Sequence, residues 1–277
     1  MGTLYLIATP IGNLQDISLR AVRLLGEVRL IAAEDTRHTG KLLAHYGIHT
    51  PLTSYFDHNK ISKLPEILAA LVEGHVALVS DAGTPGLNDP GYELVRAVIA
   101  AGFPVSPIPG PSAPVAALVS SGLPSDAFLY LGYLPRKRSE RRALLSRVTD
   151  LPYTLIFLET PNRLLQALED LQMAFGDRQV AVARELTKLH EEIFRGGLTQ
   201  ARAHYAAQPP RGEFTLVVAG RGPSSERWSE ERLSQSIQAR LIAGEPARQI
   251  AAELANESGW PRREIYQKTL AISRSTK

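Results

Sequence analysis

Two carboxylates in one glycine- and proline-rich loop have types and spacing suited to ligand chemistry. The loop, residues 80–91, reads Ser-Asp-Ala-Gly-Thr-Pro-Gly-Leu-Asn-Asp-Pro-Gly and contains Asp81 and Asp89. The apolar run 76–79 before it predicts a buried strand, and the apolar spacing after it predicts a helix. Gly83 has no Cβ, so the backbone can approach a ligand there. We expect a small-molecule site at this loop; the alternative is a tight turn in which Asp89 caps the helix.

Two similar loops, residues 9–14 and 109–113, also lie between predicted strands and helices. The first has a single glycine instead of the G-x-G-x-x-G of a dinucleotide site, and the chain has no P-loop pattern, which argues against an NTPase. Ser112 in the later loop can cap the next helix or bind a ligand. Because the carboxyl ends of parallel strands meet at one edge of a sheet, we expect the three loops to converge on one site.

Charged residues stand at the ends of three further predicted strands, at residues 34–38, 159–163 and 184–192. Such residues can accept a proton or orient a substrate. For the first group the alternative is structural: Asp35 caps the helix that follows, and Arg37 pairs with a neighbouring acid.

A basic run, residues 136–147, holds six arginines and lysines against one acid. A run of this kind is often only a solvated helix face. Its place beside the predicted cleft makes polyanion binding the other interpretation. The last segment, residues 261–277, is also basic, and the short helix signals of the tail resemble a helix-turn-helix unit.

Strand and helix signals alternate through the first 120 residues, which implies right-handed βαβ units and a largely parallel sheet. After these 120 residues the predicted strands come closer together, which predicts a second α/β domain with some antiparallel pairing. A polar linker at residues 221–225 precedes an all-helical tail. The chain is therefore predicted to be α/β, with domains at residues 1–121, 122–222 and 226–277.

The composition narrows the function classes. The 277 residues include no cysteine, which excludes disulfides, thiolate metal sites and a cysteine nucleophile. No apolar run approaches the roughly 18 residues of a membrane span, and the N-terminus reads as a strand, so we expect a cytoplasmic protein without a membrane partner. His45 and His49 have a metal-ligand spacing but no acid to help them, so we interpret them as surface residues and predict no metal.

Several ordered motifs resemble one family. They are Leu4–Leu14, Ala33–Arg37, Ser80–Pro85, Pro109–Ala113, Glu159–Arg163, Glu185–Lys188 and Gly212–Val217. Together they resemble the ribosomal RNA small subunit methyltransferase I branch of the tetrapyrrole methylase superfamily, over about residues 3–220. Glu-Thr-Pro-Asn-Arg at 159–163 departs from the family's usual Glu-Ser-Pro-His-Arg, which puts any role of that histidine position in doubt.

This resemblance implies S-adenosylmethionine bound in a cleft between two α/β domains, with a small helical domain after them. It implies methyl transfer to the ribose 2′-oxygen of a cytidine in 16S ribosomal RNA, within the small ribosomal subunit, by a homodimer. Asp81 would suit the cofactor's ammonium group, and the backbone amides around Gly83 and Thr84 would suit its carboxylate. The cofactor positions that the resemblance implies are Ile11, Asp81, Gly83, Thr84, Ser112, Ala113, Leu186 and Thr215.

A ribose hydroxyl is almost un-ionised at neutral pH, so a base near it should help. The candidate catalytic residues are Asp35, Glu34, Glu159 and Lys188, the carboxylates being the candidate bases. The candidate RNA contacts are Arg37, Arg136, Lys137, Arg138, Arg141, Arg142, Arg163, Arg262 and Arg263, and Lys188 can hold a phosphate as well.

Two other functions stay open on the sequence. One is a methylase of the same fold acting on a tetrapyrrole or corrinoid precursor, against which the basic helix and tail count. The other is a non-catalytic RNA-binding protein, against which the intact Asp81, Gly83 and Ser112 count.

Overall fold

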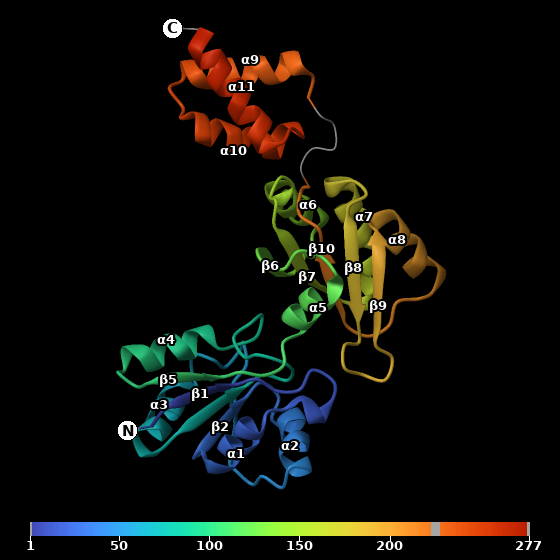
Figure 1. Cartoon of the computed structure of the whole chain (residues 1–277). Coiled ribbons are helices and arrows are strands. Elements are labelled where there is room, and N and C mark those ends of the chain that lie inside the picture. Colours follow the sequence, from blue (N-terminus) through green and yellow to red (C-terminus); the bar gives the residue numbers. More distant parts are fainter. Residues whose placement is uncertain (1, 223–227, 276–277) are drawn as a thin grey trace. The chain divides into compact units, whose positions relative to one another are not determined.

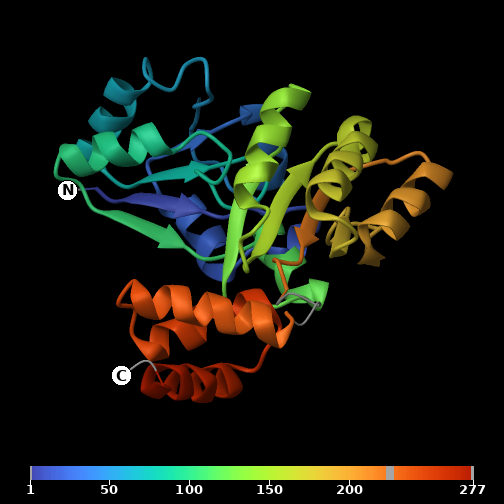
Figure 2. The same cartoon turned by 90° about the horizontal axis from the view of Figure 1, so that it is seen from above.

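The computed structural model describes residues 2–222 and 228–275. The chain forms two compact units, Met1–Arg142 with Thr154–Val218, and Ala143–Tyr153 with Ala219–Lys277. Both sheets belong to the first unit, which Figures 1 and 2 show from two sides. Part of the predicted linker, residues 223–225, and the start of the predicted third domain at residue 226 lie outside the described residues.

Five parallel strands form the first sheet, in the order β3-β2-β4-β1-β5. Every neighbouring pair in it is parallel, so the predicted parallel sheet is confirmed. The strands are β1 (Leu4–Ile7), β2 (Leu30–Ala33), β3 (Leu52–Ser54), β4 (Val76–Val79) and β5 (Val105–Ile108).

Helices cover both faces of this sheet (Figure 1). Ile31 and Ala77 face one side, whereas Ala32 and Leu78 face the other, because successive strand residues alternate. Both sets are buried, which explains why the strands read as continuous apolar runs. One face carries α1 (Leu19–Glu27) and α2 (Thr36–His45), and the other carries α3 (Leu64–Glu73) and α4 (Tyr92–Ala100).

The second sheet has the order β6-β7-β10-β8-β9 and is mostly antiparallel. Only β6 and β7 are parallel neighbours, so the predicted antiparallel pairing is confirmed. A register shift between Tyr130 and Tyr133 interrupts β6, and Gly132 there has a φ of +63°. The strands are β6 (Phe128–Tyr133), β7 (Thr154–Glu159), β8 (Gln179–Arg184), β9 (Glu192–Gly197) and β10 (Phe214–Val218).

Helix α5 (Ala113–Ser121) belongs in packing to the second sheet, although the predicted boundary at residue 121 places it in the first domain. Its Ala117 and Leu118 pack on Ile156 and Val217. The helix reads Ala-Pro-Val-Ala-Ala-Leu-Val, apolar on several sides, so it can bury a face there. The remaining helices of the α/β region are α6 (Arg138–Val148), α7 (Pro161–Phe175) and α8 (Leu198–Ala207).

Three tail helices have a core of their own. They are α9 (Glu230–Ile242), α10 (Ala247–Ser258) and α11 (Arg262–Ser275). Leu233, Ile237, Ile250 and Leu254 are fully buried in one cluster. The predicted helical tail is confirmed. Within the described residues, no helix is both long enough and apolar enough to cross a membrane.

Candidate functional site

The loops after β1 and β4 are joined at the carboxyl edge of the first sheet. The Thr9 N–H donates to the Gly83 carbonyl at 2.9 Å, and the Gly83 N–H donates to the Thr9 carbonyl at 3.0 Å. The Thr9 hydroxyl also donates to the Ser80 carbonyl at 3.1 Å. Gly83 has a φ of +80°, a conformation that glycine adopts without strain. These bonds fix the two loops together and hold Asp81 at the edge.

The loop after β5 joins them through Thr84, whose hydroxyl donates to the Pro111 carbonyl at 3.2 Å. Ser112 occupies the N-cap position of α5, but its side chain makes no capping hydrogen bond to that described helix. Ser112 instead faces a cavity. The structure therefore favours the ligand interpretation of Ser112 over the capping one.

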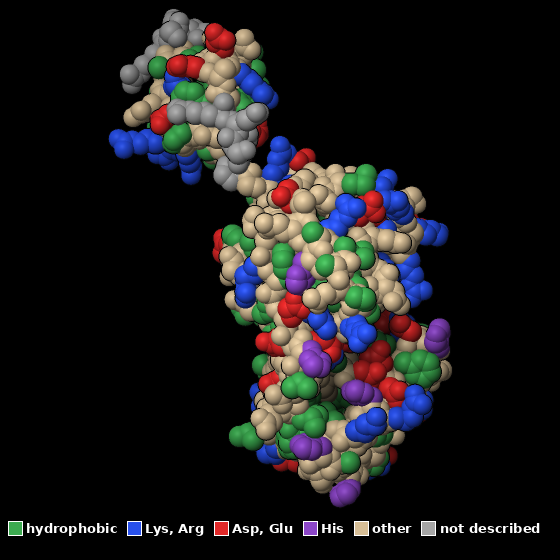
Figure 3. Space-filling model, turned by 90° about the vertical axis from the view of Figure 1, so that its right-hand side faces the viewer, with side chains coloured by type: hydrophobic (Ala, Val, Ile, Leu, Met, Phe, Trp, Pro, Cys, Tyr) green, Lys and Arg blue, Asp and Glu red, His purple; other side chains and the backbone are tan. Residues whose placement is uncertain are grey.

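A cavity of about 240 Å³ lies where the three loops meet the second sheet. All eight residues that the resemblance implies for the cofactor line it: Ile11, Asp81, Gly83, Thr84, Ser112, Ala113, Leu186 and Thr215. Segments far apart in the sequence thus form one site, as the convergence of strand ends predicts. Figure 3 shows a hollow in this region in which Asp and Glu side chains gather, with Lys, Arg and His side chains around it.

The cavity lining is negatively charged. It includes five carboxylates and, among the described residues, no lysine, arginine or histidine. A site of this charge attracts a cation and repels a phosphate. The carboxylates are Glu34, Asp81, Asp89, Glu159 and Glu213.

Glu34 and Asp89 have raised pKa values because the cavity is partly shielded from water. Burial is the main cause for both carboxyls. For Asp89, the negative charge of Glu34 adds to burial, and together they raise the pKa to about 6. For Glu34, the backbone N–H of Asp81 donates to Oε2 at 3.4 Å and opposes part of the rise. The raised pKa values suit both carboxylates to accept a proton.

Glu159, at the end of β7, is the buried acid of the opposite wall, and burial raises its pKa. Arg163 opposes that rise through an ion pair of 2.9 Å. Arg163 also donates to the Leu134 carbonyl. The Arg163 guanidinium is therefore already bound to groups in the region of the second sheet, which weakens the prediction that it contacts RNA.

Asp35 caps α2 instead of lining the cavity. Its Oδ1 accepts a hydrogen bond from the Arg37 N–H at 2.8 Å, and its Oδ2 pairs with the Arg37 guanidinium at 2.8 Å. The Arg37 side chain lowers the pKa of Asp35 to about 2. The structural interpretation of this pair is thus the one observed, and Asp35 is a poor proton acceptor because so acidic a carboxyl holds a proton weakly.

Lys188 bridges two carboxylates and does not line the cavity either. Its Nζ lies 3.0 Å from Glu185 Oε1 and 2.8 Å from Glu213 Oε2. Burial works against the charge, but these hydrogen bonds raise its pKa above the ordinary value. A Cβ on Gly12 would clash with Lys188 Cγ, so the first loop packs on this side chain. The geometry favours a positioning role for Lys188 over a catalytic one.

The basic helix uses part of its charge internally. Asp170 of α7 is fully buried and accepts hydrogen bonds from Arg138 at 3.1 Å, Arg141 at 2.8 Å and Arg142 at 3.0 Å. The Arg141 side chain is only 4% exposed, so we correct its prediction as an RNA contact. Arg138 and Arg142 are about half exposed, at 52% and 45%.

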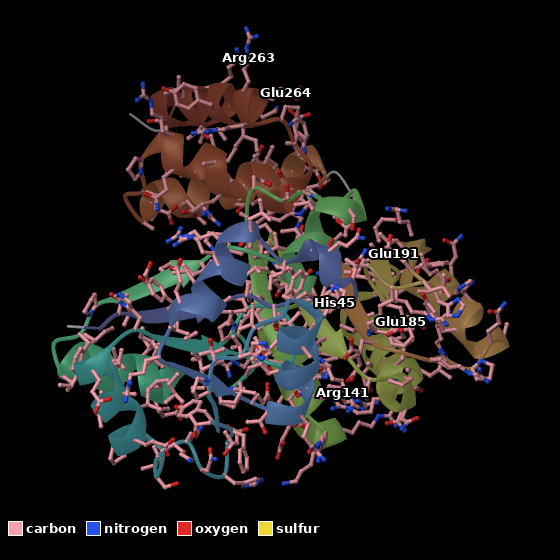
Figure 4. The ribbon with its side chains drawn as sticks, turned by 90° about the horizontal axis from the view of Figure 1, so that it is seen from below. His45, Arg141, Glu185, Glu191, Arg263 and Glu264 are labelled. Atoms are coloured by element: carbon pink, nitrogen blue, oxygen red, sulfur yellow. The ribbon has the colours of Figure 1, made fainter. Side chains whose placement is uncertain are left out.

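Arg136 and Lys137 are exposed, and Lys137 pairs with Glu140 at 3.2 Å. In the tail, Arg262 and Arg263 are exposed on α11, and Arg263 points away from the helices (Figure 4). All four side chains are exposed and can meet a polyanion at the surface, although Lys137 must share its charge with Glu140.

Sequence reasoning left Asp89 open between ligand chemistry and a helix cap, and it did not assign four other lining residues to the site: Asn88, Tyr130, Tyr133 and Glu213. Asp89 was readable as a cap, but α4 begins after Gly91, which holds its N-cap position. The Tyr130 hydroxyl is buried and has no hydrogen-bond partner in the part of the chain that the structure describes. Gly132 has a positive φ and lies against the Asn88 amide, so a glycine is needed where β6 approaches the loop. The sequence shows the glycine but not that β6 and the loop are neighbours.

Comparison with known proteins agrees with this architecture. The family Tetrapyrrole (Corrin/Porphyrin) Methylases matches residues 3–202. A Synechocystis protein named ribosomal RNA small subunit methyltransferase I is 50% identical over 98% of this chain and 99% of its own length. A protein of the same name from Halalkalibacterium halodurans is 45% identical over 96% of this chain and 93% of its own length.

Solved structures share the fold. A cobalamin biosynthetic enzyme, cobalt precorrin-4 methyltransferase, has a TM-score of 0.60 at 15% identity, over 78% of this chain and 94% of its own. Uroporphyrin-III C-methyl transferase from Thermus thermophilus, solved in complex with S-adenyl homocysteine, has a TM-score of 0.54 at 20% identity, over 78% and 97%.

Proposed function

Because the chain belongs to the tetrapyrrole methylase family, in its ribosomal RNA small subunit methyltransferase I branch, we propose that it methylates 16S ribosomal RNA. The proposed donor is S-adenosylmethionine, and the acceptor is the ribose 2′-oxygen of a cytidine in the small ribosomal subunit. The observation that carries the proposal is the cavity at the carboxyl edge of the parallel sheet, whose charged lining residues are all acids.

The cavity fits this cofactor by charge. S-adenosylmethionine carries a sulfonium and an ammonium group, and the carboxylates around it favour both cations. Asp81 would bind the ammonium group, and the hydroxyls of Ser112 and Thr215 would meet the adenosine. The Gly83 N–H is not available for the cofactor's carboxylate, because it already donates to Thr9. Of the two backbone amides expected to bind the cofactor's carboxylate, we therefore keep only that of Thr84.

When bound, S-adenosylmethionine supplies a methyl group on a positively charged sulfur, which is a good leaving group. The chain contributes the position of the acceptor and a group to take its proton. We assign the proton to the pair Glu34 and Asp89: as the 2′-oxygen bonds to the methyl carbon, its O–H bond breaks and the proton passes to a carboxylate. A carboxyl with a raised pKa holds that proton better than Asp35, whose pKa is about 2.

A methyl-transfer assay tests the function. Small subunits lacking the modification would be incubated with deuterium-labelled S-adenosylmethionine, and digested RNA would be resolved into nucleosides by mass spectrometry. We expect label on the ribose of a cytidine. Label on the base would contradict the 2′-oxygen assignment, and label on a corrinoid precursor but not on RNA would favour the small-molecule function.

Two separate sets of cations are proposed to contact RNA. Arg136, Lys137, Arg138 and Arg142 belong to the first compact unit, and Arg262 and Arg263 belong to the second. Phosphate contacts from exposed cations supply most of the affinity of such a surface. The tail core is closed by its own residues, such as Leu233 and Ile237, which supports a separate RNA-docking module. A chain ending at residue 222 should keep its melting temperature and cofactor affinity and lose RNA affinity. Earlier melting would instead favour a stabilising tail.

A homodimer is also proposed. Val115 and Val119 of α5 are 49% and 70% exposed, and a second copy of the chain would cover them. Val119→Asp should shift sedimentation toward the monomer without lowering cofactor affinity. A wild-type monomer at micromolar concentration would overturn this point.

A further inference from the structure

A second cavity, of about 260 Å³, lies beside the first and differs from it in charge. Its lining includes His38 and the cation Lys41, both of α2, whereas the described lining of the first cavity contains no lysine, arginine or histidine. Asp81 borders both cavities. A cationic ligand would thus bind in the first cavity and an anionic group in the second, with Asp81 between the two ligands.

The walls of this second cavity suit a nucleoside. Pro10, Leu14 and Leu42 give it apolar surface, and the buried hydroxyl residues Thr9 and Thr39 lie among them. Unpaired bases of RNA are bound by such surfaces because their faces are apolar and their edges are polar. A cavity of this volume holds one nucleoside and is too small for a tetrapyrrole macrocycle.

Two side chains beside it suit a phosphate, since Lys41 is a cation and the His38 ring can donate a hydrogen bond. His38 and Lys41 are exposed, and neither forms an ion pair with another residue within the described ranges. The neighbouring Arg37 is different, because Asp35 neutralises it at 2.8 Å. Unlike Arg37, Lys41 can therefore bind a phosphate without first breaking an ion pair inside the protein.

We propose that this second cavity binds the acceptor nucleotide, with the base against Pro10, Leu14 and Leu42, the phosphate at His38 and Lys41, and the ribose toward Asp81. Glu34 lines the first cavity, and its Oε2 accepts a hydrogen bond from the N–H of Asp81, the residue that borders both cavities. This assignment rests on the proposed function and specifies where its substrate binds.

The first test locates the nucleotide without requiring methyl transfer. A small-subunit RNA fragment with 5-iodocytidine at the acceptor position would be crosslinked to the full chain by ultraviolet light, and the peptides mapped. We expect crosslinks within residues 9–14 or 38–42. Crosslinks on Tyr130 or Tyr133 in the first cavity would overturn the assignment.

The second test uses variants. Leu14→Trp should fill the cavity, and Lys41→Ala should remove one phosphate contact, raising the KM for small subunits roughly tenfold and flattening the salt dependence of RNA binding by about 0.7 in slope. The affinity for S-adenosylmethionine and the melting temperature should stay unchanged. Arg96→Ala is the matched control, because this exposed arginine lies on α4, on the opposite face of the sheet.

The outcomes separate the two proposals. Wild-type protein that methylates small subunits while both variants match it would refute the second cavity and leave the function intact. Wild-type protein that crosslinks at residues 9–14 but transfers no methyl group would refute the function and leave the RNA cavity intact.

Discussion

The backbone N–H of Asp35 donates a hydrogen bond to Oδ1 of Asp81 at 3.0 Å. This bond ties the end of β2 to the end of β4 and holds the carboxylate of Asp81, a residue that lines both cavities. Asp35 thus acts at the site through its backbone, while its side chain caps α2. The arrangement explains how two acids 46 positions apart contribute to one site in different ways.

We predict that Asp81→Ala weakens S-adenosylmethionine binding by about 1.5–3 kcal/mol, the contribution of one charge-assisted hydrogen bond. Asp81→Asn should weaken it less, because its amide oxygen can still accept the Asp35 N–H. Titration calorimetry measures both, with the exposed Asp126→Asn as the control. Unchanged affinity in a folded Asp81→Ala protein would remove Asp81 from the cofactor site.

Methyl transfer should depend on pH through Glu34 and Asp89. A proton acceptor must be ionised, so kcat/KM, which reports the free enzyme, is expected to fall as pH drops through about 6, the pKa of Asp89. Because the two carboxyls interact, the acidic limb of the pH profile gives an apparent pKa of the pair and not of either residue alone. Glu34→Gln should lower kcat by about 10²–10⁴-fold.

Asp35→Asn provides the comparison for the pH profile, since its side chain does not line the cavity. We expect it to retain most of the activity and the same acidic limb. Loss of activity in Asp35→Asn but not in Glu34→Gln would reverse the assignment of the base.

Asp89→Asn is predicted to stabilise the protein at neutral pH. The folded-state pKa of about 6 lies above the ordinary 3.8, so the native state keeps a proton that the unfolded state has released. The free energy of unfolding therefore falls as pH rises between these values, by on the order of 3 kcal/mol. Urea denaturation at pH 4 and pH 7.5 should show equal stabilities at the lower pH and a more stable variant at the higher one. If the variant and the wild type had the same free energy of unfolding at both pH values, ionised Asp89 would not destabilise the fold.

Asp170→Asn should be strongly destabilising. Its carboxylate is fully buried under Arg138, Arg141 and Arg142, and its loss leaves Arg141 buried without its ion-pair partner. We expect the free energy of unfolding to drop by about 3–5 kcal/mol. Glu140→Gln is the control, because it breaks only the exposed pair with Lys137 and should cost less than about 1 kcal/mol. A loss of similar size in both would contradict the anchoring role of Asp170.

The double variant Arg136→Ala and Lys137→Ala should raise the Kd for ribosomal RNA. Two lost phosphate contacts would reduce the slope of log K against log salt by roughly 1.4–1.8. Cofactor affinity should not change, because neither residue lines the cavity. Fluorescence anisotropy over a range of salt concentrations measures the effect. An unchanged slope would mean that this end of α6 is only a solvated face.

The sequence by itself determined the elements and the edge at which they meet. Continuous apolar strands such as Val76–Val79 can be buried only between two layers of helices, so a parallel sheet with ligand loops at its carboxyl edge followed from local pattern. The loops that line the first cavity were predictable for the same reason, because each directly follows a strand.

Only the tertiary structure decided which charges are used where. Asp35, Glu34 and Asp89 are all acids near strand ends, yet Arg37 lowers the pKa of one to about 2 while burial raises the pKa values of the other two. Arg141 and Arg136 belong to one basic run, but Asp170, contributed by another helix, buries the first. Burial and partners come from residues distant in the chain, and a one-dimensional pattern carries neither.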